Sequence, residues 1–166
     1  MTDLSLAIRP ENPGEADVIE KLHERAFGPG RFARTAFRLR EGVPHEEALS
    51  FTALVGTLVV GSIRLTRIRI GAADGLLLGP VTVEPAFMGR GIGMALVSRS
   101  VEAAREQGHR LVLLVGDEPF YGKVGFRRVP AGRLAMPGPV DPARLLILEL
   151  QPGAFEGVAG PVAPIA

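Results

Sequence analysis

The sequence predicts a mixed α/β fold, and three observations indicate it. The 166 residues suffice for one domain with a substantial core, and no internal repeat is visible. Segments with the hydrophobic period of strands and of helices follow one another along the chain. Their order is a strand, two helices, three strands, a long helix, a strand, a short helix and more strands, unlike a repeating β-α-β-α pattern. We expect a single domain over 1–166, with 151–166 as a Gly/Pro-rich tail.

The first 42 residues predict a strand and two helices. Residues 4–9 form a short strand that Pro10 ends, and residues 15–27 have apolar side chains at helical spacing. Gly28 and Pro29 end this helix, and a second helix follows over 31–40. One stripe of the second helix, which we interpret as a solvent-facing surface, carries Arg31, Arg34 and Arg38.

A hairpin is predicted next, over 49–55 and 58–70, with its turn at Gly56-Thr57. The apolar phase slips within its second strand, because Ile63 and Leu65 share one face while Ile68 and Ile70 lie on the other. We expect either a bulge near Arg67 or a frayed strand end.

The strand over 76–83 is almost continuously apolar, which is typical of burial on both faces. Pro80 lies inside it, although proline cannot donate to a ladder and is rare in central strands. Local rules tend to fail at functional sites, so we predict a bulge at Gly79-Pro80 beside the functional site.

The last half of the chain predicts one long helix among strands. Residues 91–107 carry a buried stripe at helical spacing, and Gly108 is the expected C-cap. The other elements are expected at 110–115 (buried strand), 117–124 (short helix), 127–129 (strand), 132–142 (loop) and 145–150 (strand). We expect the strand over 145–150 to be exposed, so that it could pair in a homodimer.

Composition excludes several classes of function. The formal net charge is +1, whereas proteins that bind nucleic acid through overall charge carry a basic surplus. There is no cysteine, and the three histidines are far apart in sequence, so we expect neither disulfides nor a metal site. No signal segment or membrane-length apolar run is visible. We therefore expect a cytoplasmic protein without nucleic-acid or membrane partners.

The most informative segment is V-T-V-E-P-A-F-M-G-R-G-I-G-M-A-L, residues 81–96. A strand stops at a proline, and a glycine-spaced turn leads into the long helix. Free amides and the positive end of the helix dipole then favour a phosphate. The dinucleotide fingerprint fails because Met94 replaces its third glycine, and a P-loop fails because Val124 follows Gly122-Lys123. A plain strand-to-helix turn explains the glycines equally well.

Two further motifs accompany this turn. L-L-G-P-V-T-V-E-P (77–85) precedes it, and F-Y-G-K-V-G-F (120–126) follows one strand later. Together, over about 76–130, they resemble the GNAT superfamily of acyl-coenzyme A-dependent N-acetyltransferases. Gly91 and Gly93 match the pyrophosphate turn Gln/Arg-x-x-Gly-x-Gly/Ala of that family, but Met88 stands where it has Gln or Arg. The resemblance implies a mostly antiparallel sheet with helices on both faces and splayed central strands.

The resemblance also implies a site for acetyl-CoA as cosubstrate. Pantetheine would lie along the strand that ends at Val83, and the strand over 110–115 would diverge to admit it. Arg90 is expected to add charge near the phosphates, although an exposed turn arginine explains it equally well. The residues expected to contact the coenzyme are Val81, Thr82, Val83, Met88, Gly89, Arg90, Gly91, Ile92, Gly93 and Met94.

Three residues are expected to take part in acetyl transfer. By the resemblance, the backbone N–H of Val81 polarises the thioester carbonyl, and Tyr121, the single tyrosine, protonates the leaving thiolate. An alkylammonium must lose a proton before it can attack. Glu84 is the first candidate for that base, with Asp117 and Glu118 as others, and each is also explained as an ordinary surface carboxylate.

The acceptor is expected to be a primary amine of a small molecule or a peptide. Balanced charge argues against a dedicated polyamine enzyme, which would need an acidic pocket. A coenzyme A-binding sensor without catalysis, suggested by Met88, is the alternative, and an enzyme for longer acyl chains is a variant.

Overall fold

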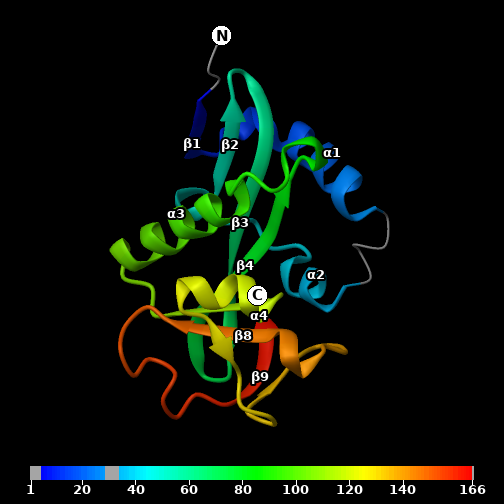
Figure 1. Cartoon of the computed structure of the whole chain (residues 1–166). Coiled ribbons are helices and arrows are strands. Elements are labelled where there is room, and N and C mark those ends of the chain that lie inside the picture. Colours follow the sequence, from blue (N-terminus) through cyan, green and yellow to red (C-terminus); the bar gives the residue numbers. More distant parts are fainter. Residues whose placement is uncertain (1–4, 29–33, 166) are drawn as a thin grey trace.

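The computed structural model describes residues 5–28 and 34–165 and contains one twisted sheet (Figure 1). Its main path runs β1-β2-β3-β4-β5-β8-β6, and β9 pairs with both β3 and β7. All pairs on this path are antiparallel except β4–β5. The strands are β1 (Leu6–Pro10), β2 (Phe51–Val55), β3 (Leu58–Ile70), β4 (Ala73–Val83), β5 (Leu111–Val115), β6 (Arg127–Arg128), β7 (Leu134–Ala135), β8 (Leu145–Glu149) and β9 (Gly160–Pro164).

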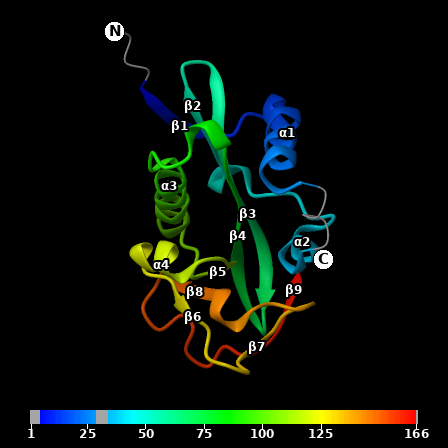
Figure 2. The ribbon, with the colours of Figure 1, turned by 45° about the vertical axis from the view of Figure 1, so that its right-hand side comes forward.

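The helices cover both faces of the sheet, as expected from the resemblance. Figure 2 shows α3 on one side of the long β3–β4 ribbon and α1 and α2 on the other. The helices are α1 (Ala16–Phe27), α2 (Thr35–Arg40), α3 (Ile92–Glu106) and α4 (Glu118–Tyr121), with single turns at Pro13–Glu15, Glu47–Leu49, Pro85–Phe87, Gly122–Val124 and Pro142–Arg144. Within the described part of the chain, no helix is long and apolar enough to cross a membrane.

Two buried clusters explain the change of apolar phase in β3. Ile63 and Leu65 pack in the cluster under α3, whereas Ile68 and Ile70 pack in a second cluster that contains Leu39 of α2. The register with β4 is continuous from Leu65 to Ile70. The expected bulge near Arg67 and the alternative of a frayed end were therefore wrong. From Leu65 to Ile70 the strand stays regular, and β3 is covered on opposite faces in its two halves.

The irregularity in the centre of the sheet lies at Gly79-Pro80, as predicted. Ile63 pairs with Val81 and Leu65 pairs with Leu78, so two residues of β4 oppose the single residue Arg64. The Gly79–Pro80 peptide bond is cis, and Gly79 has a φ of 119°. The extra residue of the bulge changes which side chains of β4 face α3. Before the bulge these are Leu76 and Leu78, and after it they are Val81 and Val83.

The β4–β5 pair is short. It holds only Leu76 with Val112 and Leu77 with Leu113, although both strands continue beyond these residues. The two strands separate at the level of the bulge, which agrees with the expected splay. The gap opens next to the start of α3.

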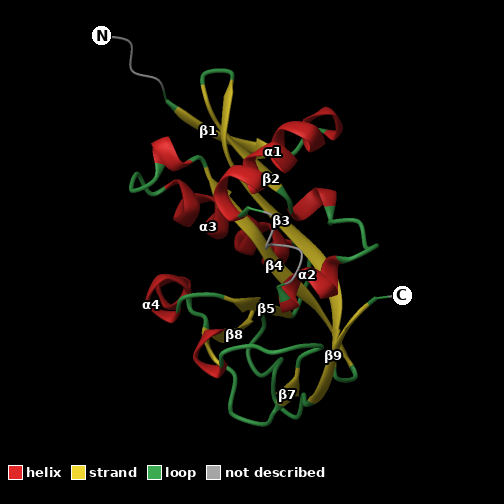
Figure 3. Ribbon diagram, turned by 90° about the vertical axis from the view of Figure 1, so that its right-hand side faces the viewer, coloured by secondary structure: helices red, strands yellow, loops and turns green. Residues whose placement is uncertain are grey.

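The C-terminal part differs from the prediction in two ways. The strand expected over 145–150 is not exposed, because β8 lies between β5 and β6. The tail also contributes β9, which pairs with the second half of β3 and closes the second cluster (Figure 3). The prediction missed β7 because it has only two residues, and it missed β9 because Gly-Pro-Val-Ala-Pro is rich in poor strand formers.

Candidate active site

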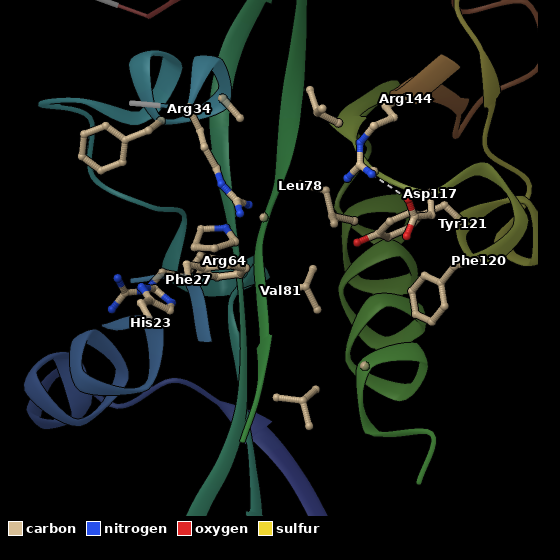
Figure 4. A pocket seen from close by; sticks show the side chains of 18 of the residues that line it. His23, Phe27, Arg34, Arg64, Leu78, Val81, Asp117, Phe120, Tyr121 and Arg144 are labelled. Atoms are coloured by element: carbon tan, nitrogen blue, oxygen red, sulfur yellow. Dashed lines mark hydrogen bonds and ion pairs between the residues drawn. The ribbon is translucent and has the colours of Figure 1, made fainter. Parts of the chain in front are cut away.

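A cavity of about 1120 Å³ passes between the two faces of the sheet at the β4–β5 gap. Its lining comes from α1 and α2 on one face and from β4, α3 and α4 on the other. Figure 4 shows this arrangement: His23, Phe27, Arg34 and Arg64 lie on one side of β4, and Asp117, Phe120, Tyr121 and Arg144 on the other. The cavity can therefore receive two molecules from opposite directions.

The glycine turn forms one end of the cavity. Gly89 and Gly91 have φ angles of 80° and 78°, a left-handed conformation that glycine adopts without strain. Gly91 is the N-cap of α3, and among the described residues no side chain caps this helix start. The amides of the first turn are therefore available to an anion. Met88 is 66% exposed at the edge of this turn, so its apolar side chain leaves the amides uncovered.

Most of the residues predicted to contact the coenzyme line this cavity. They are Val81, Val83, Met88, Gly89, Gly91, Ile92, Gly93 and Met94. The other two do not. Thr82 is buried on the face opposite Val81, and the guanidinium of Arg90 lies 4.9 Å from the centre of the Phe87 ring.

Tyr121 lies on the α3 side of the gap, at the end of α4. Its ring meets those of Phe120 and Phe126 edge to face, with centres 4.8 and 5.9 Å away. Gly116 leaves room for it, since a side chain there would overlap the ring. Figure 4 shows the tyrosine directed from α4 toward β4. Among the described residues nothing hydrogen-bonds its hydroxyl, which is therefore free for a ligand.

Burial and charge favour the protonated form of this phenol. Burial raises the pKa of Tyr121, and the negative charge of Asp117 adds to the rise, while Arg144 opposes it. Asp117 and Arg144 form an ion pair of 2.7 Å at the edge of the same cavity. At neutral pH the phenol of Tyr121 is therefore protonated.

Glu84 has a different environment from the one expected for the base. One of its carboxylate oxygens lies 2.7 Å from Nη2 and 3.1 Å from Nε of Arg25 in α1, and Glu84 does not line the cavity. Glu118 also lies off the cavity, 2.9 Å from Arg128. Of the three carboxylates considered, only Asp117 borders the cavity.

The sequence analysis missed the cations on the opposite side. Arg34 and Arg40 of the α2 segment and Arg64 of β3 all line the cavity. Arg34 was placed on a solvated stripe, and Arg31 of that stripe lies outside the described residues. No sequence signal separates these arginines from the others in the chain, because only the packing of α2 against the sheet brings them to the cavity.

Comparison with known proteins identifies the family. A model of the GNAT acetyltransferase domain matches residues 46–128, a range that contains the bulge, the glycine turn and Tyr121. The uncharacterized N-acetyltransferase YjhQ of Escherichia coli K12 is 32% identical over 129 residues, which span 75% of this chain and 71% of that protein.

Solved structures give the same family. The GNAT family N-acetyltransferase YhbS of Escherichia coli, in complex with CoA, is similar in fold with a TM-score of 0.83 and 24% identity, covering 99% of this chain and 92% of that one. A GNAT family acetyltransferase of Brucella melitensis, in complex with acetyl-CoA, has a TM-score of 0.72 and 29% identity, covering 99% and 98%. The matched domain model and the identity to YjhQ extend this likeness from fold to sequence, and the chain belongs to the GNAT family of acetyltransferases.

Proposed function

We propose that this enzyme transfers the acetyl group of acetyl-CoA to a primary amine of a small molecule or peptide, by direct attack in a ternary complex. The observation that carries the proposal is the cavity, because it joins the uncapped start of α3 to Tyr121 and continues to the other face of the sheet. The Brucella melitensis relative holds acetyl-CoA, which supports this ligand.

The coenzyme would enter from the α3 side. The amides of Ile92, Gly93 and Met94 would bind its pyrophosphate at the positive end of the helix. An ideal Cβ on Gly93 would lie 3.7 Å from both Phe120 and Val83, so Gly93 lies between these two side chains beside the turn. The edge of β4 from Val81 to Val83, free where β5 diverges, would hold the extended pantetheine by backbone hydrogen bonds. Thr82 supplies its backbone to this edge, and Arg90 contributes charge from outside the cavity.

Acetyl transfer then needs three groups of this chain. The N–H of Val81 would donate a hydrogen bond to the thioester carbonyl as negative charge develops on that oxygen. The amine nitrogen would form the new C–N bond while the C–S bond breaks. Tyr121 would give its proton to the departing thiolate, a role that its raised pKa suits. The proton that the attacking nitrogen releases would pass to solvent water, because Glu84 is engaged with Arg25 away from the cavity.

Ligand-induced thermal shifts test whether the protein binds acetyl-CoA. Acetyl-CoA and CoA should raise the melting temperature, and NADH should not. Gly91→Ala should reduce the acetyl-CoA shift, because it places a methyl group at the turn. Gly108→Ala is the matched control: Gly108 follows the other end of α3 with a φ of 82°. A shift with NADH alone would overturn the proposal.

Release of free thiol from acetyl-CoA across a panel of amines tests whether the protein catalyses acetyl transfer. An enzyme releases one thiol for each amine acetylated, whereas a sensor binds acetyl-CoA and releases none. The absence of amine-dependent release from every primary amine would favour the sensor.

A further inference from the structure

The α1–α2 mouth of the cavity carries positive charge that no carboxylate in the described part of the chain neutralises. Arg64 is balanced, because its guanidinium lies 2.9 Å from the buried carboxylate of Glu11. Glu20, the carboxylate of α1 in the lining, lies 3.7 Å from His23. Within 5–28 and 34–165, by contrast, no carboxylate pairs with Arg34 or Arg40. Arg34 instead stacks over Phe27, with its guanidinium carbon 4.9 Å from the ring centre.

Arg40 reaches the centre of the site. It is the last residue of α2, and its Nη1 lies 3.6 Å from an ideal Cβ built on Gly79. The backbone nitrogen of Val81 lies 3.8 Å from the same point. The guanidinium therefore approaches the bulge from the α2 face, beside the N–H proposed to polarise the thioester. Among the described residues no acceptor hydrogen-bonds the Arg40 guanidinium. Its N–H groups are therefore available to a ligand in the cavity that Arg40 lines.

The charge of Arg34 also acts on Arg40. Burial lowers the pKa of Arg40 to about 10, and the nearby charge of Arg34 contributes to the fall. Arg40 remains charged at neutral pH, partly desolvated and next to a like charge. An anion bound between them would remove this repulsion and would be held by the planar fork of an arginine, which matches carboxylate and phosphate oxygens.

We propose that Arg40, assisted by Arg34, binds an anionic group of the acceptor, so that the substrate is a small amine that also carries a carboxylate or a phosphate. The proposal rests on the proposed acetyl transfer. Because Nη1 of Arg40 and the nitrogen of Val81 lie 3.6 and 3.8 Å from the same point beside Gly79, we expect only a few bonds between the anionic group and the reacting amine. An α-amino acid and a phosphorylated amino alcohol both meet this requirement, whereas a polyamine would be repelled.

A second role for Arg40 makes a different prediction. A guanidinium beside Val81 could instead contact the thioester carbonyl, and its loss would then lower kcat for every acceptor equally. The proposed role affects only acceptors with an anionic group, and it affects KM more than kcat. Paired acceptors therefore separate the two roles.

The experiment measures thiol release with matched acceptors: glycine and glycinamide, L-alanine and L-alaninamide, L-phenylalanine and L-phenylalaninamide, and O-phosphoethanolamine and ethanolamine. The wild-type enzyme should favour the anionic member of at least one pair by 10-fold or more in kcat/KM. Amino acid amides have less basic amines than the acids and are intrinsically more available for attack, so this order runs against simple reactivity. The phosphate pair separates the two anionic groups.

Arg40→Gln should raise KM for the preferred anionic acceptor by about 10- to 100-fold and leave its neutral counterpart within twofold. Arg105→Gln is the matched control, because Arg105 does not line the cavity and its exposed side chain pairs with Glu102 at 3.0 Å. Both variants should keep the wild-type acetyl-CoA thermal shift.

Three results overturn the inference: equal or better use of the neutral members, failure of every anionic acceptor, or an Arg40→Gln loss that is the same within each pair. Loss of the acetyl-CoA shift in the wild-type protein would instead count against the proposed function.

Discussion

At the scale of single residues, Tyr121 gives the most direct test of the chemistry. Tyr121→Phe removes the hydroxyl but keeps the ring between Phe120 and Phe126. We expect kcat to fall by about 10²- to 10⁴-fold, the usual contribution of a general acid. The dissociation constant for acetyl-CoA should stay within twofold, because the glycine turn is untouched. Single-turnover kinetics and calorimetric titration measure the two quantities, and unchanged turnover would remove the assignment.

Glu84 gives the complementary test. Because its carboxylate is paired with Arg25 outside the cavity, Glu84→Gln should keep kcat within about threefold and retain the acidic limb of the pH–rate profile. Glu118→Gln, which breaks the exposed pair with Arg128, is the control for losing a carboxylate near the site. If the acidic limb disappears in Glu84→Gln alone, Glu84 is the base after all.

Residues that a motif carries could be predicted from the sequence, and residues that only packing brings together could not. The spacing of Gly91 and Gly93 located the helix start, and Pro80 marked the bulge because it breaks a local rule. Arg40 belongs to no motif and breaks no local rule, so the sequence does not single it out. It reaches Gly79 only because Thr35 and Arg38 fasten α2 to the carbonyls of Pro139 and Pro137, some hundred residues along the chain.

At the scale of elements, Glu11 joins three segments. It follows β1, and its carboxylate meets Arg64 of β3 at 2.9 Å and His45 of the segment before β2 at 3.3 Å. Burial alone would raise the pKa of Glu11, but the hydrogen bonds from His45 and Arg64 outweigh it and lower the pKa to about 2. The carboxylate therefore stabilises the fold above the unfolded pKa of 4.5, and this stabilisation is lost as the pH falls toward 2.

Chemical denaturation across pH tests this linkage. Glu11→Gln should lower the free energy of unfolding by about 3 kcal/mol at pH 7, and the difference from wild type should shrink between pH 5 and pH 2. Asp74→Asn is the matched control, since the Arg69–Asp74 pair is exposed and should contribute less than about 1 kcal/mol. A difference that does not change with pH would mean that packing, not charge, holds these segments together.

At the scale of elements, the hydrophobic periodicity of the sequence predicted the strands that are long and apolar. The reversal of the buried face within β3 could not be derived from one strand, because it depends on α3 covering Ile63 and Leu65 while α2 and β9 cover Ile68 and Ile70. A single-strand view offers only a bulge or a frayed end, and both were wrong.

At the scale of the whole molecule, the two buried clusters stabilise different parts of the fold. The cluster under α3 contains Ile92 and Leu96 next to the glycine turn. The second cluster joins Phe155 and Val162 of the C-terminal segment to Ile68 and Ile70 of β3. Composition indicated only a Gly/Pro-rich tail over 151–166 and no strand in it. Instead Ala154, Phe155 and Val162 are buried, and Gly71 donates its N–H to the Pro161 carbonyl at 2.9 Å. The segment belongs to the core although its composition is that of a linker.

Phe155 tests whether this segment carries stability. Its ring is 3% exposed, packs in the second cluster and lies 4.2 Å below the guanidinium of Arg133. Phe155→Ala should cost about 3–5 kcal/mol and lower the melting temperature by roughly 6–20 °C. Val18→Ala, at a site 45% exposed, should change stability by less than about 0.5 kcal/mol. Because Phe155 does not line the cavity, acetyl-CoA should still raise the melting temperature of the variant by the wild-type increment. A fall of under 2 °C would show that the tail adds little to the fold, whereas a lost acetyl-CoA shift would show that the second cluster also supports the site.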